Sequence, residues 1–121
     1  MQSPANAYEK VAAQISNPRE MEAALLLQAA QRLQAAQTEG GKDSSALNKA
    51  LTHNRKVWTI FLASATDANS PLERSVRENV ANLGLFVIKQ TMAVASNPRP
   101  EGLAPLININ RELAAGLLGR A

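Results

Sequence analysis

Residues able to carry out catalysis are scarce in this chain of 121 residues. Cysteine is absent, and His53 is the only histidine, without a carboxylate three or four residues away that could complete a metal site. Ser44, Ser45 and Ser64 have no base nearby in the sequence, no glycine-rich phosphate loop is present, and the acidic residues are scattered. We therefore interpret His53 as a surface or interhelical residue and expect no enzymatic activity, metal or cofactor.

Two polar clusters interrupt otherwise apolar segments and are the best candidates for a partner-binding site. Asn54 and Arg55 precede Trp58 in the first cluster, and the second consists of Asn108, Asn110 and Arg111. Two interpretations remain open. In one, the amides form a structural network between helices, because an unsatisfied buried amide costs about 1–3 kcal/mol. In the other, they are polar anchors in a binding groove, and the tryptophan is likewise either a core residue or an interface anchor.

The composition favours one globular helical domain over residues 1–121. Hydrophobic residues make up 45% of the chain and charged residues 19%, which is typical of folded proteins. Alanine, leucine and glutamine are abundant and aromatics are few, so helix is favoured over strand. No run approaches the ~20 apolar residues of a membrane span, and no signal peptide is recognisable. The absence of cysteine suits the reducing cytoplasm, which is the expected location.

The basic charge of the chain is spread out along the sequence. The formal net charge is +3, and the thirteen Lys and Arg residues are interleaved with ten acidic residues. Arg55 and Lys56 are the only adjacent basic pair. A surface that follows a phosphate backbone normally needs clustered cations. Direct binding of nucleic acid is therefore disfavoured.

Helical periodicity predicts about five helices. They cover residues 8–15, 18–39, 45–65, 70–95 and 105–117. In the third, Asn54 occupies a position where the apolar stripe requires a hydrophobic residue. Residues 96–102 contain two prolines and a glycine and are predicted to break the chain before the fifth helix. Residues 106–110 partly alternate as a strand would, but the apolar spacing after Pro105 fits a helix better.

The fourth segment is predicted to be the apolar centre of the bundle. Ser70, Pro71 and Glu73 provide a cap, a preset first turn and a capping-box acid. Two apolar stripes follow, consisting of Leu72, Val76, Val80, Leu83, Val87 and Val94, and of Leu85, Ile88, Met92 and Ala95. Two apolar faces predict packing on both sides, and Gly84 predicts a close helix crossing. The predicted fold is an all-α, single-domain bundle of about five helices with an apolar central fourth helix.

Four stretches of the chain carry a family resemblance. They are AYEKVAAQISNPREMEAALL at residues 7–26, NRKVW at residues 54–58, the Ser70–Pro71–Leu72 helix start, and PLININRELAAGLLG at residues 105–119. In order and spacing they resemble the FlaF flagellar biosynthesis regulators of alphaproteobacteria. The sequence departs from the family pattern at His53 and Phe86, where tryptophan is common, and at Gln90, where histidine is frequent. Because Phe86 remains apolar, it is expected in the core.

The resemblance implies a flagellin secretion chaperone or adaptor, required for flagellin synthesis and export and acting beside the regulator FlbT. The positions that match the family motifs, and are therefore the expected partner-binding residues, are Asn54, Arg55, Trp58, Ile107, Asn108, Asn110 and Arg111. Flagellin termini are long amphipathic helices, and a groove that includes the third and fifth helices would cover them. The alternative is a post-transcriptional regulator that acts through FlbT or on flagellin messenger RNA, which the basic pI of about 9.7 favours. A structural subunit of the export apparatus would fit the same fold.

Overall fold

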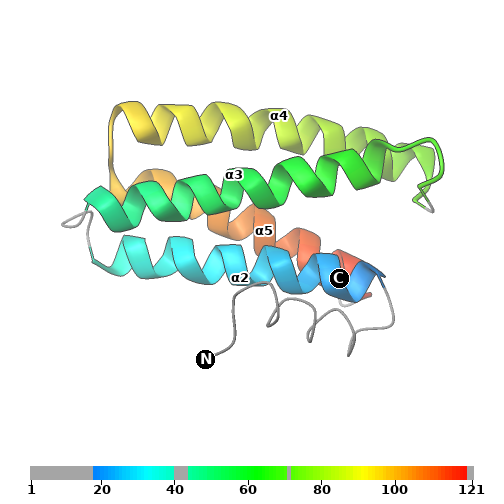
Figure 1. Ribbon diagram of the computed structural model, residues 1–121, viewed down its shortest axis with the longest axis horizontal. Coiled ribbons are helices and arrows are strands. Elements are labelled where there is room, and N and C mark those ends of the chain that lie inside the picture. Colours follow the sequence, from blue (N-terminus) through cyan, green and yellow to red (C-terminus); the bar gives the residue numbers. More distant parts are fainter. Residues whose placement is uncertain (1–17, 40–43, 71, 120–121) are drawn as a thin grey trace, which may run out of the picture.

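The computed structural model describes residues 18–39, 44–70 and 72–119. They form a single bundle of four α-helices and one 3-10 helix, with no strand in these three ranges (Figure 1). The elements are α2 (Pro18–Thr38), α3 (Ser44–Thr66), α4 (Arg74–Ser96), η1 (Pro100–Leu103) and α5 (Ala104–Leu117). The all-α prediction is confirmed, while the helix predicted over residues 8–15 lies outside the described residues. None of the described helices is long and apolar enough to cross a membrane.

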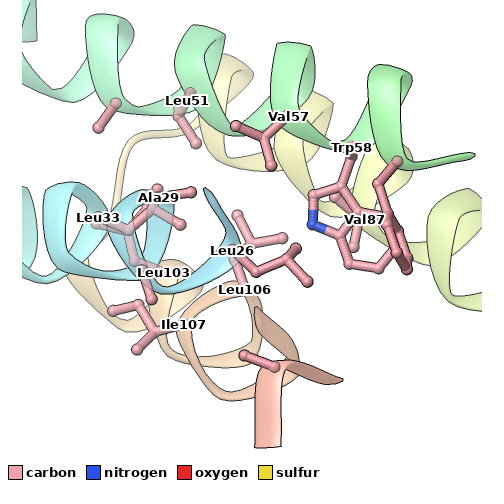
Figure 2. Packing of buried hydrophobic residues seen from close by; sticks show 14 of the residues in the cluster. Leu26, Ala29, Leu33, Leu51, Val57, Trp58, Val87, Leu103, Leu106 and Ile107 are labelled. Atoms are coloured by element: carbon pink, nitrogen blue, oxygen red, sulfur yellow. The ribbon is translucent and has the colours of Figure 1, made fainter. Parts of the chain in front are cut away.

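Helix α2 is the central element, because it packs against α3, α5 and η1. Four of the six hydrophobic residues on its buried face are alanines. The six residues are Ala23, Leu26, Ala29, Ala30, Leu33 and Ala36. Alanines at this spacing let neighbouring helices approach closely. Figure 2 shows side chains of α2, α3, α4, η1 and α5 meeting in one apolar cluster. Trp58 is the largest fully buried side chain in this cluster.

The prediction that the fourth helix is central is wrong. Helix α4 packs chiefly against α3 and makes smaller contacts with α5 and η1, and Figure 1 shows it along one edge of the bundle. The close crossing predicted at Gly84 is confirmed, because a Cβ atom there would lie 2.6 Å from Cδ1 of Leu62 on α3. Only one apolar face of α4 is used by this contact.

Helix α4 also begins later than its sequence pattern predicts. The hydroxyl of Ser70 accepts a hydrogen bond from the backbone N–H of Leu72 at 3.2 Å, which closes a local turn. Glu73 has extended backbone angles, φ −61° and ψ 152°, and acts as the N-cap residue. The first helical hydrogen bond runs from the Arg77 N–H to the Glu73 carbonyl at 2.9 Å. Ser70 therefore forms a turn and does not cap the helix.

The connection from α4 to α5 is tied to the end of α4. The side-chain amide of Gln90 donates to the carbonyl oxygen of Gly102 in η1 at 2.9 Å. A Cβ atom at Gly102 would lie 2.8 Å from Cγ2 of Val94, so η1 sits close against α4. The predicted break begins one residue later than expected, at Asn97, and its second half forms η1, which leads directly into α5. This contact fixes the direction in which α5 returns to α2.

Candidate functional site

Three of the predicted site residues form a buried hydrogen-bond chain between α3 and α5. The indole N–H of Trp58 donates to Oδ1 of Asn110 at 2.8 Å, and Nδ2 of Asn110 donates to Oδ1 of Asn54 at 2.7 Å. An indole nitrogen can only donate, so Trp58 determines which end of the Asn110 amide faces it. Both asparagines are 0% exposed. The chain therefore joins two helices inside the core.

This geometry matches the interpretation in which the two amides form a structural network between helices. Side chains without exposed surface cannot touch a partner in this conformation, and their hydrogen bonds orient α3 against α5. The ring of Trp58 also packs edge-on against Phe61, with centroids 5.7 Å apart. Nδ2 of Asn54 has no hydrogen-bond partner among the described residues. A direct partner-binding role for Asn54, Trp58 and Asn110 stays a prediction.

The other four predicted site residues are separated. Ile107 is buried in the core, whereas Arg55 is exposed on α3 and Asn108 is exposed on α5. The guanidinium of the exposed Arg111 donates to the side-chain oxygen of Gln34 on α2. The structure thus places Arg111 beside α2 and apart from the buried network.

A candidate binding surface that the sequence analysis interpreted as core lies on α4. Leu85, Ile88 and Met92 are 59%, 40% and 65% exposed, and we call these three residues the α4 stripe. Their spacing of three and four residues places them on one helix face. The expectation that this stripe is packed is wrong, because α4 faces α3 with its other side. Phe86, expected in the core, is also exposed.

The buried face of α4 carries mostly small side chains and its exposed face carries larger apolar ones, which is the reverse of an ordinary surface helix. Its buried positions are Val80, Gly84, Val87, Thr91 and Val94. Leu83 is partly buried against the core, but the other large apolar side chains of the helix, Leu85, Phe86, Ile88 and Met92, are exposed. A surface helix normally directs its largest apolar residues into the core. A row of large exposed apolar residues is typical of a protein-interaction surface.

A known protein family matches most of the chain. The model of the family described as flagellar protein FlaF matches residues 4–117. The chain belongs to the FlaF family. No curated protein and no solved structure matches it. The family match confirms the resemblance drawn from the four sequence motifs, and FlaF is not known as a family of enzymes. Both the buried network and the α4 stripe lie within the FlaF match.

The titratable groups of this FlaF-family chain that have shifted pKa values lie on α2 and α3. Burial raises the pKa of Glu22, although its carboxylate accepts a hydrogen bond from Ser64 at 3.3 Å and lies near Arg19. Burial also lowers the pKa of His53, and the nearby cations Arg32 and Lys56 lower it further. In the described ranges, no group of three or more histidine and acidic residues could hold a metal ion.

Proposed function

We propose that this FlaF-family chain is a cytoplasmic flagellin-binding chaperone or adaptor, required for flagellin synthesis and export, and that it binds flagellin through the α4 stripe. The observation that carries the proposal is the exposure of Leu85, Ile88 and Met92 on one face of a helix whose other face is buried. An amphipathic helix of a partner recognises such a surface with its own apolar anchors at matching spacing.

Flagellin termini suit this surface because they are amphipathic helices that expose apolar side chains before assembly. The α4 stripe extends over the eight residues from Leu85 to Met92, or about 10 Å along the helix axis, which matches two turns of a partner helix. Met92 is unbranched and flexible, so it can adapt to helices of different sequence. Binding of this kind is reversible and requires no cofactor.

The proposed surface differs from the groove of the third and fifth helices that the sequence suggested. The polar anchors expected in that groove, Asn54 and Asn110, are enclosed in the core. On α4, by contrast, the apolar atoms are accessible without any rearrangement of the bundle. We therefore assign flagellin binding to α4.

Calorimetric titration with monomeric flagellin tests this proposal, with a flagellin that lacks its terminal helices as the second ligand. We expect saturable binding to the complete monomer and none to the truncated one. The double variant Leu85→Ser/Met92→Ser should weaken binding more than tenfold, because buried apolar anchors at an interface typically contribute over ~1 kcal/mol each. Ile60→Ser is the matched control, since Ile60 is 60% exposed on α3, away from the stripe.

Different failures of this experiment have different meanings. If neither flagellin binds, the chaperone function is wrong, and regulation through FlbT or flagellin messenger RNA becomes the better hypothesis. If flagellin binds the double variant and the wild type equally well, the function stands but the assignment to α4 is wrong. Circular dichroism of each variant shows whether the helical fold is retained.

A further inference from the structure

Three cations from two helices line one open hollow between α2 and α3. They are Arg32 of α2 and Lys49 and Lys56 of α3. The remaining lining residues that the structure describes are Ser45, Asn48, Thr52 and His53. None of these seven residues is acidic, and the uncharged ones carry hydroxyl, amide or imidazole groups that can donate hydrogen bonds. We call this surface the basic hollow.

The structure describes no acidic residue paired with the cations of the basic hollow. None of the three forms an ion pair within the part of the chain that the structure describes. Lys49 and Lys56 are seven residues apart on one helix, so their backbones are separated by about 10 Å, with His53 between them. Arg32 approaches from the other wall. The hollow therefore presents a row of positive charge two helical turns long.

The imidazole in the hollow responds to this positive charge. After burial, the largest cause of the lowered pKa of His53, the next causes are Arg32 and Lys56, which disfavour a further positive charge. An anion placed among these groups would relieve that repulsion. The charge row and the histidine effect are independent of the α4 stripe, none of whose residues lines the hollow.

We propose that the basic hollow binds an acidic helical segment of a partner protein, whose carboxylates repeat at i, i+3 or i+4, and i+7 to face Lys49, Lys56 and Arg32. Complementary charges at this spacing match the two turns of α3 that line the hollow. Single-stranded RNA fits less well, because the described lining contains no aromatic side chain on which a base could stack. This second binding site does not depend on the proposed function.

His53 makes the hollow directly observable, because it is the only histidine in the chain. The experiment is an NMR pH titration of its imidazole in the full-length protein, alone and with a soluble helical peptide that carries glutamates at i, i+4 and i+7. We expect the peptide to raise the pKa of His53 from its depressed value, since bound carboxylates favour the imidazolium form. By linkage, the peptide should bind more tightly as pH falls through this range.

Two controls separate a specific site from general attraction to a basic protein. A peptide with the same glutamates on different helix faces tests the spacing. Lys56→Gln should weaken binding of the first peptide about three- to fivefold, the effect of removing one exposed ion pair. Lys89→Gln removes the same charge from an exposed residue of α4 that does not line the hollow, and should leave the affinity unchanged.

The proposal is overturned if the spaced peptide leaves the pKa of His53 unchanged at saturating concentration. It is also overturned if the rearranged peptide binds equally well, or if Lys89→Gln and Lys56→Gln have the same effect. Polyuridylate of matched charge is the nucleic-acid arm of the test. A larger shift of the His53 pKa with polyuridylate than with the spaced peptide would replace the acidic segment with RNA as the ligand.

Discussion

Replacing Asn110 with leucine tests the buried hydrogen-bond chain most directly. Leucine has the same heavy-atom branching as asparagine but can neither donate nor accept a hydrogen bond. Asn110 is the middle member of the chain, since it accepts from Trp58 and donates to Asn54. Asn54 is a terminal member, with a second nitrogen that has no partner among the described residues. The two substitutions therefore differ in how many partners they leave unsatisfied.

The expected costs follow from counting these groups. Asn110→Leu leaves the indole N–H of Trp58 and the amide oxygen of Asn54 without hydrogen-bond partners. Because each unsatisfied group costs about 1–3 kcal/mol, we expect the unfolding free energy to fall by about 2–5 kcal/mol. Asn54→Leu leaves only Nδ2 of Asn110 without a partner, and it also removes the Nδ2 of Asn54, which has none already. We therefore expect the unfolding free energy to fall by only about 0–1 kcal/mol. The double variant strands only the indole and should cost less than the two single changes together.

Urea unfolding of the wild type and the three variants, followed by circular dichroism, measures these differences. The decisive quantity is the difference in unfolding free energy between the two single variants, and Asn54→Leu should be the more stable by at least ~1 kcal/mol. Equal losses for both variants would refute the assignment of Asn110 as the middle of the chain. Strictly additive losses in the double variant would show that Asn54 and Asn110 are not coupled.

Three further predictions concern the core and its borders. Gly116→Ala, where the new Cβ would meet no atom within 4 Å, should stabilise the bundle by about 0.5–1 kcal/mol in urea unfolding, whereas Gly84→Ala should give a smaller gain or a loss, because Leu62 must move to admit the Cβ; an equal gain for both variants would contradict the close crossing. Trp58→Ala should cost about 3–5 kcal/mol by the same measurement, and an unchanged stability would contradict its place in the core. Because the pKa of Glu22 is raised in the folded state, its contribution to stability is complete below the ordinary value of 4.5 and is lost as pH rises through the shifted value. Glu22→Gln should therefore increase the thermal midpoint relative to wild type at pH 7 but not at pH 4, and the opposite pH trend would contradict the burial effect.

The periodicity of the sequence identified the helices well but gave their arrangement poorly. Asn54 was recognisable as a polar residue in an apolar stripe, and Gly84 as the site of a close crossing, because both are local exceptions to a helical pattern. The start of α4 was less predictable. Ser70 has the residue type of a cap, but its hydroxyl bonds to the N–H two residues later, and only the backbone path decides between these two uses.

The candidate surfaces were harder to predict, because both depend on which helices become neighbours. Asn54 and Asn110 are 56 residues apart, and nothing in either segment indicates that they pair. The cations of the basic hollow look evenly scattered in the sequence and gather only when α2 packs beside α3. Apolar periodicity likewise shows that α4 has two stripes, but not which of them the rest of the bundle covers. Charge and apolar patterns can be read from the sequence of one helix, but whether a surface is exposed depends on which helices pack against it.

The choice of face on α4 is the strongest physical argument that this helix is shaped for binding. Complete burial of a leucine, isoleucine or methionine side chain contributes roughly 1.5–3 kcal/mol, so a bundle selected for stability alone would turn the α4 stripe inward. Instead, Gly84 and small residues such as Val87 face α3, which allows a close crossing and leaves the large side chains in solvent. An exposed apolar row also raises the risk of aggregation. A partner helix that covers the α4 stripe would bury these side chains and remove that risk.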